Sequence, residues 1–492
     1  MTNGSFPVGV RRRVLAVACL SVFMIVSSLS ALNVALAEVA DALSAEIEDL
    51  QWIVDAYAVT FAGLLLAGGA IGDRVGRRAA LLCGYAVFGI ANALAAVVDS
   101  VGPIVGLRAL AGLGAALIMP ASLAAVSEVY DDGGRPQAIA IWSSIAAAGG
   151  AFGPFLGGAL VTAAGWPSVF SGNAAMAALG LVGAVAWVPT LRGRRVGPFD
   201  VVGAGLSVAA VASLIYLVIE GPRHPFASTS LLALALTIAL TVWFVRHEGR
   251  SKHPLLPLDL LRDRSRVAGA GTLVLAALGF NGVFFVGSLG LQIGWGESGL
   301  VAGLLLVPIG VVEVGVANVA IRFARRTGLE NALTIGLCFM AVGYVGMGFT
   351  PAGNRLWFVL AGVIAGVGNG LTIPLSVERI MGTVEPAFAG AAASVNDMAI
   401  ELGASAGIGL LGTVQGLWFE ARRPDGRTTP ISDIVDGADR TAFRGATAAA
   451  FGVAAAVALA AIPVARSTLR LDAVSASRPR GRRTSPPGSP ET

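Results

Sequence analysis

The chain has 492 residues, of which 55% are hydrophobic, only 13% are charged and 65 are glycine. Soluble domains carry about 25% charged residues, so this composition excludes an ordinary soluble protein. The formal net charge is +4, and we attribute the basic excess to membrane topology rather than to nucleic-acid binding. The composition therefore predicts an integral membrane protein.

Apolar stretches of about 20 residues, long enough to cross a hydrocarbon core of about 30 Å as helices, recur along almost the whole chain. They are rich in Gly and Ala and apolar on nearly every face, which favours helices and excludes a β-barrel. We predict an all-α membrane fold with fourteen transmembrane helices. The predicted spans are 14–36, 52–71, 79–98, 102–124, 137–161, 167–189, 200–220, 229–246, 267–291, 300–321, 331–349, 355–378, 387–414 and 445–465.

An even number of spans places both termini on one side of the membrane. Most of the 34 Lys and Arg residues lie in loops on that side, so the positive-inside rule predicts two cytoplasmic termini in the inner (plasma) membrane. The predicted organisation is a cytoplasmic N-terminus (1–13), a six-helix bundle (14–189), linkers with two inserted helices (190–266), a second six-helix bundle (267–465) and a disordered basic tail (466–492).

Two loops indicate that the six-helix bundles are repeats of one unit. The sequence GDRVG at 72–76 follows the second span, and ARRTG at 324–328 follows the tenth span at the corresponding position. Such duplication is common among transporters.

The first of these loops combines glycines and charged residues in a pattern that an ordinary basic loop does not need. In GAIGDRVGRR (69–78), glycines permit close helix approach and charges lie beside helix ends. The segment resembles the cytoplasmic-loop signature of the major facilitator superfamily, in which the Asp faces a helix of the opposite half and helps to hold the cytoplasmic side shut. The alternative is a plain positive-inside loop. The resemblance assigns a cytoplasmic gate to Gly69, Asp73, Arg74, Gly76, Arg77 and Arg78.

The fifth span carries glycines at one helix face. Gly149, Gly153 and Gly157 recur every four residues, Pro154 lies among them, and Gly158 extends the smooth surface. Small residues in this pattern favour close helix contact. The segment GGAFGPFLGG also resembles the glycine-proline signature of exporting, antiporter members of the superfamily, although generic helix packing is an alternative.

Fourteen spans together with segments at 27–36, 50–69 and 389–413 resemble the fourteen-helix drug:proton antiporters. In that family the first helix commonly carries an Asp five residues before the Asn matched by Asn33. Ser28 occupies that position here. The usual carboxylate of the first helix is therefore absent.

The fourth span contains a basic residue, Arg108, at membrane depth. A buried guanidinium costs roughly 3 kcal/mol, so it needs a partner or a function. The segment LRALAGLGAA (107–116) resembles the fourth-helix motif of the family, with Ala111 where that motif usually has Gln. The resemblance implies that Arg108 relays protons or pairs with a charge.

Four acidic residues lie inside or at the edge of spans: Asp55, Glu313, Asp397 and Glu401. Carboxylates at membrane depth are costly and tend to face a cavity. Burial of Glu313 favours its protonated form, and Asp397 and Glu401, four residues apart, share one helix face. A structural hydrogen-bonding role is the alternative for these three residues, and an interfacial position for Asp55. The WIVDAY segment around Asp55 resembles exporters of quaternary ammonium compounds and related cations.

These acids suggest a mechanism, because a cation and a proton compete for the same buried negative charge. We predict a secondary active efflux transporter that exchanges amphipathic, cationic drugs for protons by alternating access. An exporter of one endogenous metabolite or antibiotic, or a proton-coupled importer on the same fold, are the alternatives. Aromatic side chains for cation contact are available at Trp142, Phe280, Phe284 and Phe285.

Other function classes leave no signature in the sequence. A phosphate loop, a zinc motif and a nucleophile elbow are all missing, so we expect neither an ATP-driven pump nor an enzyme, and no cofactor or metal. The expected partners are an amphipathic small molecule, protons and membrane lipid, with no nucleic acid, and the expected state is a monomer.

Overall fold

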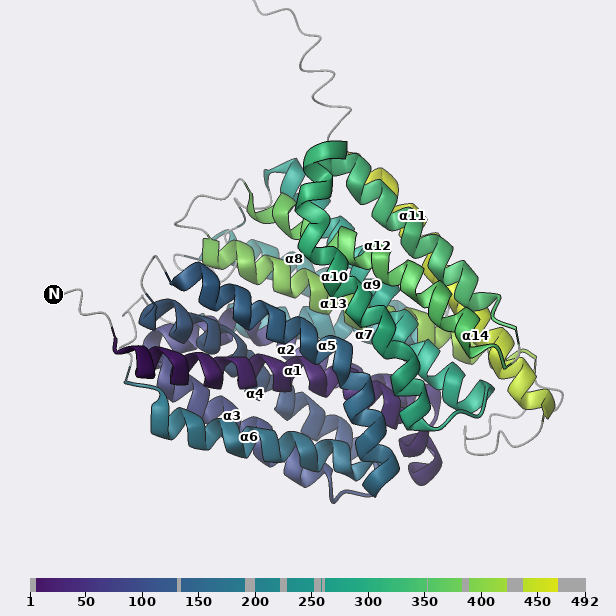
Figure 1. Cartoon of the computed structure of the whole chain (residues 1–492), viewed down its shortest axis with the longest axis horizontal. Coiled ribbons are helices and arrows are strands. Elements are labelled where there is room, and N and C mark those ends of the chain that lie inside the picture. The colour runs from purple at the N-terminus through teal and green to yellow at the C-terminus, as the bar shows by residue number, and fades with distance from the viewer. Residues whose placement is uncertain are drawn as a thin grey trace, which may run out of the picture.

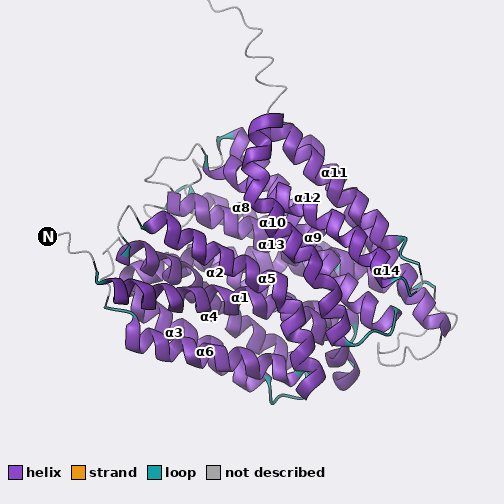
Figure 2. Cartoon of the chain, in the orientation of Figure 1, coloured by secondary structure: helices purple, strands orange, loops and turns teal. Residues whose placement is uncertain are grey.

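The computed structural model describes residues 6–130, 134–190, 200–221, 228–251, 258, 262–351, 353–382, 389–422 and 437–467. Within these residues the regular secondary structure is helical throughout (Figure 2). The first five residues, much of the predicted linker region and residues 468–492 of the predicted tail lie outside the described residues.

Each of the fourteen predicted spans coincides with a helix. In the part of the chain that the structure describes, thirteen helices are long and apolar enough to cross a membrane, and there are fourteen when the two pieces of α2, bent by 56°, count as one span. The helices are α1 (Val8–Leu43), α2 (Ile47–Val75), α3 (Arg77–Ala95), α4 (Val101–Val129), α5 (Arg135–Ala164), α6 (Pro167–Trp187), α7 (Val201–Glu220), α8 (Ser228–Glu248), α9 (Arg264–Leu289) with a π-helical extension η2 (Gly290–Gly294), α10 (Gly299–Thr327), α11 (Leu329–Gly348), α12 (Arg355–Met381), α13 (Ala389–Glu420) and α14 (Gly437–Ala465).

Side-chain caps define where several helices begin. Asp200 accepts a hydrogen bond from the Gly203 N–H at the start of α7. Asn354 accepts one from the Trp357 N–H at the start of α12. These residues satisfy backbone donors that have no partner inside the helix. These two helices therefore begin directly after a polar capping residue.

Helices α1–α6 form one bundle and α9–α14 form the other (Figure 1). The packing repeats with an offset of eight helices: α1 packs on α5 as α9 does on α13, α2 on α4 as α10 does on α12, and α3 on α6 as α11 does on α14. The prediction of two related six-helix bundles is confirmed.

The two loops that suggested the repeat have the same backbone conformation. Gly76 has φ 94° and ψ 146°, and Gly328 has φ 86° and ψ 145°. Both residues link two helices directly, α2 to α3 and α10 to α11. A residue with a Cβ is strained at this positive φ, which explains why glycine stands at both positions.

We call the side where α1 begins and α14 ends the terminal side, and the opposite side the far side. In Figure 1, α1 runs almost horizontally while α11 and α12 slope toward it, so the bundles converge at the right, on the far side. One hydrophobic core joins them there, because it contains the far ends of α1 and α2 together with buried residues of α9–α12. Elsewhere the first bundle has cores of its own.

The inserted helices α7 and α8 form a pair beside this junction. Helix α7 packs against α2 of the first bundle and against α13 of the second, and α8 packs against α7. The inserted pair therefore contacts both bundles through α7.

Candidate functional site

A cavity of about 510 Å³ lies between the two bundles. Helices α1, α2, α4 and α5 line one wall, and α9, α10, α12 and α13 line the other. Three of the four predicted carboxylates, Glu313, Asp397 and Glu401, line this cavity together, and the described residues of its lining include no Lys, Arg or His. All three acids belong to the second bundle.

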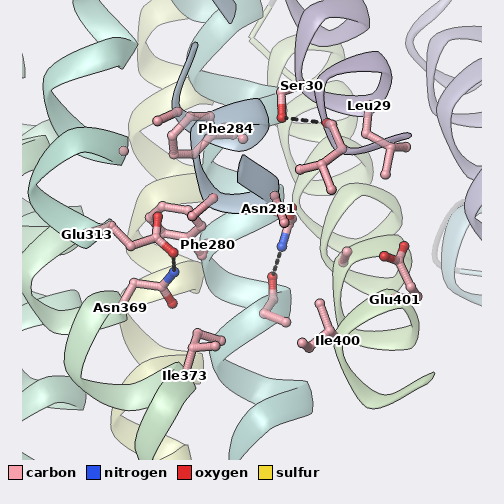
Figure 3. Close-up of a pocket in the computed structure, with 18 of the residues that line it drawn as sticks. Leu29, Ser30, Phe280, Asn281, Phe284, Glu313, Asn369, Ile373, Ile400 and Glu401 are labelled. Atoms are coloured by element: carbon pink, nitrogen blue, oxygen red, sulfur yellow. Dashed lines mark hydrogen bonds between the residues drawn. The ribbon is translucent and has the colours of Figure 1, made fainter. Parts of the chain in front are cut away.

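Glu313 projects from α10 toward Asn369 of α12. The Asn369 amide donates a 2.8 Å hydrogen bond to Glu313 Oε1, and Figure 3 draws this pair at one side of the cavity. A donor in this position stabilises the ionised carboxylate against the cost of burial. Sequence analysis did not single out Asn369, although an Asn inside an otherwise apolar span was a visible signal.

Asp397 and Glu401 lie one turn apart on α13, as their spacing predicted. Asn396 donates a 3.1 Å hydrogen bond to Asp397 Oδ1. Glu401 lies across the cavity from Glu313 (Figure 3). Acidic groups are thus present on two sides of the same space.

The first bundle contributes a largely apolar wall. Ile25, Leu29, Phe61 and Met119 belong to it, with Asn33 among its few polar groups. A ligand with a charged end and an apolar body matches this asymmetry, because its charge can approach the acids while its body contacts the opposite wall.

Two of the four candidate aromatics line the cavity. The rings of Phe280 and Phe284 pack with centroids 4.8 Å apart. Phe285 instead lies fully buried in the core that joins the bundles. Trp142 packs within the first bundle, where its indole N–H donates a 3.3 Å hydrogen bond to Ser122.

Asp55 lies in the seam between α2 and α13 and is not among the described residues that line the cavity. It is fully buried, and the Ser405 hydroxyl of α13 donates a 2.7 Å hydrogen bond to its Oδ1. The sequence gave no information about the face of α2 that contacts the second bundle.

Arg108 is buried against α2. Its Nε donates a 3.0 Å hydrogen bond to the Ile53 carbonyl, and its guanidinium lies 4.4 Å from the centroid of the Tyr57 ring. A cation over an aromatic face is stabilised by the ring quadrupole. The structure therefore gives this buried charge partners on α2.

Ser28, which replaces the usual acid of the first helix, is buried inside the first bundle. The Asn173 amide of α6 donates a 2.9 Å hydrogen bond to the Ser28 hydroxyl. Ser28 does not line the cavity, whereas Leu29 and Ser30 beside it do.

The predicted gate loop is tied to its own bundle. Asp73 forms an ion pair with Arg77, Arg74 donates to the Ala70 carbonyl at 3.3 Å, and Arg78 donates to the Val185 carbonyl of α6 at 2.6 Å. The Gly69 backbone lies near the side chain of Pro120 in α4.

The glycine motif of α5 supports close contacts on two faces. A Cβ on Gly149, Gly153 or Gly157 would meet the backbone of α1 near Phe23, Ser27 and Ala31 respectively. On the other face, Gly158 lies against Gly299 of α10, and the Pro154 carbonyl lies against Gly303. The motif therefore packs α5 closely against α1 of its own bundle and against α10 of the second bundle.

Comparison with known proteins assigns the class. The sequence profile of the Major Facilitator Superfamily matches residues 18–408, so the chain belongs to this family of membrane transporters. Among solved structures, a bacterial homolog of the human lysosomal transporter Spinster has the same fold, with a TM-score of 0.69 at 15% identity, covering 94% of this chain and 99% of that chain.

Several relatives are efflux or resistance proteins. The multidrug efflux pump LfrA of Mycolicibacterium smegmatis is 33% identical, covering 94% of this chain and 90% of the relative. The tetracenomycin C resistance and export protein of Streptomyces glaucescens is 30% identical, covering 87% and 86%. The multidrug resistance protein Stp of Mycobacterium tuberculosis is 29% identical, covering 82% and 75%. The predicted family is confirmed.

Proposed function

We propose that this transporter exports amphipathic cations in exchange for protons by alternating access. The observation that carries the proposal is the cavity between the bundles, in which Glu313, Asp397 and Glu401 face a largely apolar opposite wall and no basic residue is found among the described lining residues. The relatives that are described as multidrug efflux or antibiotic export proteins support the direction of transport.

Exchange follows from competition for the buried negative charge. A cation bound at the acids is displaced when a proton neutralises them, and loss of that proton restores the binding site. We assign proton and cation binding to Glu313, Asp397 and Glu401. Asp55 and Arg108 contribute to proton coupling from the contacts of α2, outside the cavity.

The proposed orientation places the terminal side in the cytoplasm of a cell with this protein in its plasma membrane. Most Lys and Arg residues lie in loops on that side, as the positive-inside rule requires. The bundles then meet at the extracellular side, so the conformation described here is the one open toward the cytoplasm. The gate loop around Asp73 would hold the cytoplasmic side shut in the opposite conformation.

Efflux from proteoliposomes tests the proposal. An imposed pH gradient should drive exchange of ethidium by the wild type but not of an uncharged drug, and Glu313→Gln and Glu401→Gln should abolish the ethidium exchange. Asp41→Asn is a matched control, because Asp41 is exposed near the end of α1. If both cavity variants exchange at the wild-type rate, the carboxylate mechanism is wrong. If the uncharged drug is exported equally well, cation selectivity is wrong.

A further inference from the structure

A buried glutamine joins the two bundles and the inserted pair at one point. Gln51 of α2 is fully buried, and its amide nitrogen lies 3.0 Å from the Ile408 carbonyl and 2.8 Å from the Gly409 carbonyl of α13. The same nitrogen lies 3.5 Å from the Thr413 hydroxyl. Thr413 in turn donates a 3.2 Å hydrogen bond to the Ile219 carbonyl of α7.

Glycines on α13 make room for both neighbours. A Cβ on Gly412 would overlap the Gln51 amide, and a Cβ on Gly409 would lie 3.1 and 3.2 Å from Val218 and Ile219 of α7. The lack of a side chain at Gly412 lets α2 approach α13 closely, and the lack of one at Gly409 does the same for α7. A buried amide is costly when its hydrogen bonds are lost, so Gln51 favours the arrangement in which α2 and α13 are in contact.

A second polar contact continues the same seam one turn away. Asp55, four residues after Gln51, accepts the 2.7 Å hydrogen bond from Ser405, which lies four residues before Gly409. In a helix, residues four apart lie on one face. The seam between α2 and α13 is therefore a row of hydrogen bonds on the far side.

Helix α7 covers this seam along much of its length. Trp52 of α2 and Tyr216 of α7 have ring centroids 6.3 Å apart. Ile215 and Ile219 of α7 are fully buried in a cluster with Val59 of α2. One inserted helix thus contacts both helices that must separate if the far side opens.

We propose that Gln51 is the latch of the far-side gate and that α7 is a third element of that gate, held to the latch through Thr413. Opening on the far side breaks the contacts of Gln51 with α13. The inference rests on alternating access as proposed above, and it gives the inserted pair a function in transport. Gln51 acts through the conformational equilibrium and is a positioning residue.

Cysteine labelling tests this proposal without requiring transport. The three native cysteines, Cys19, Cys83 and Cys338, are replaced by Ser, and Ser288→Cys serves as the reporter. Ser288 is fully buried on α9 and donates to the Asn33 carbonyl of α1, so it lies where the bundles meet. A membrane-impermeant maleimide added to the far side labels this cysteine only when the gate opens.

Gln51→Leu and Thr413→Val should each raise the labelling rate several-fold. Gln415→Leu is the matched control, because this buried glutamine of α13 bonds to Val286 and Thr447 within the second bundle, and it should label at the wild-type rate. Thr413→Val keeps the side-chain shape and remains informative if Gln51→Leu folds poorly.

The outcomes separate the latch from the transport mechanism. Wild-type labelling in both Gln51→Leu and Thr413→Val, or an equal rise in Gln415→Leu, overturns the latch. Increased labelling in the first two variants supports the latch even if the proteoliposomes show no proton-driven ethidium exchange, a result that would overturn the proposed function alone.

Discussion

Asn369 of α12 donates a hydrogen bond to Glu313 of α10 across the wall of the cavity, with 2.8 Å between nitrogen and oxygen. The bond links a side chain that does not ionise to one of the proposed proton carriers. Its strength therefore influences how readily Glu313 releases a proton.

Asn369→Leu should weaken ethidium binding and raise the KM of exchange. The amide stabilises the ionised carboxylate, and hydrogen bonds to charged groups contribute about 1.5–3 kcal/mol. Since about 1.4 kcal/mol corresponds to a factor of ten in affinity, we expect a loss of about tenfold or more. Asn318→Leu is the control, because Asn318 of α10 bonds only to the Val314 carbonyl of its own helix among the described residues. An unchanged KM in Asn369→Leu would contradict the role of the bond.

Tyr57→Leu should destabilise the protein while Tyr57→Phe should not. The guanidinium of Arg108 lies 4.4 Å from the Tyr57 ring centroid, and a desolvated contact of this kind contributes about 2 kcal/mol. Phenylalanine keeps the aromatic face, whereas leucine removes it and leaves the buried charge less stabilised. Thermal unfolding in detergent measures the difference. Equal melting temperatures for the two variants would show that the ring contact contributes little.

Gly157→Val should reduce stability by about 1–3 kcal/mol, as overpacking of a close contact does. A Cβ at this position of α5 would overlap the Ala31 backbone of α1. Gly102→Ala in α4 is the control, because nothing lies within 4 Å of its added Cβ and alanine favours helices over glycine. Melting temperature and expression level report the result, and a stable Gly157→Val protein would argue against the close packing of α1 and α5.

Asp200→Asn should lower stability at neutral pH by removing a charge near His247, whose Nε2 lies 2.8 Å from the carboxylate. Partial burial raises the pKa of Asp200, but the hydrogen bonds from the Gly203 N–H and His247 outweigh it, so the pKa lies below its ordinary value of 3.8. The contribution of the ionised group is therefore present above about pH 3.8 and lost as pH falls through the lowered pKa.

Thermal unfolding of the wild type and of Asp200→Asn, measured over a range of pH, tests this pH dependence of stability. The two melting temperatures should differ at pH 7 and converge below about pH 3.8. Asn is still a good N-cap, whereas Asp200→Ala should lose about 1 kcal/mol more at every pH. A difference between wild type and Asp200→Asn that grows toward low pH would contradict the expected direction.

Hydrophobic length alone located all fourteen helices, because each must cross the same thickness of lipid. It underestimated several of them: α13 continues to Glu420, and α1 begins at Val8, since helices extend beyond the hydrocarbon core into polar surroundings. The repeat was also visible, because Gly76 and Gly328 are required by the same backbone conformation.

The sequence located the acidic residues on their helices but not the directions in which their side chains point. Glu313, Asp397 and Glu401 meet in one cavity. Asp55 instead faces the seam of α2 and α13, because the rotation of a helix is set by packing between distant segments. The role of Gln51 was not predictable from the sequence either, because its hydrogen-bond partners lie more than 350 residues away in the chain.

The asymmetry of the cavity has an electrical consequence. The described acids that line the cavity all belong to the second bundle, so a change in their protonation alters the charge of that bundle. A membrane potential of 100 mV does about 2.3 kcal/mol of work on each elementary charge that crosses it. In the proposed rocking motion, the part of that work that depends on protonation is therefore done on the second bundle.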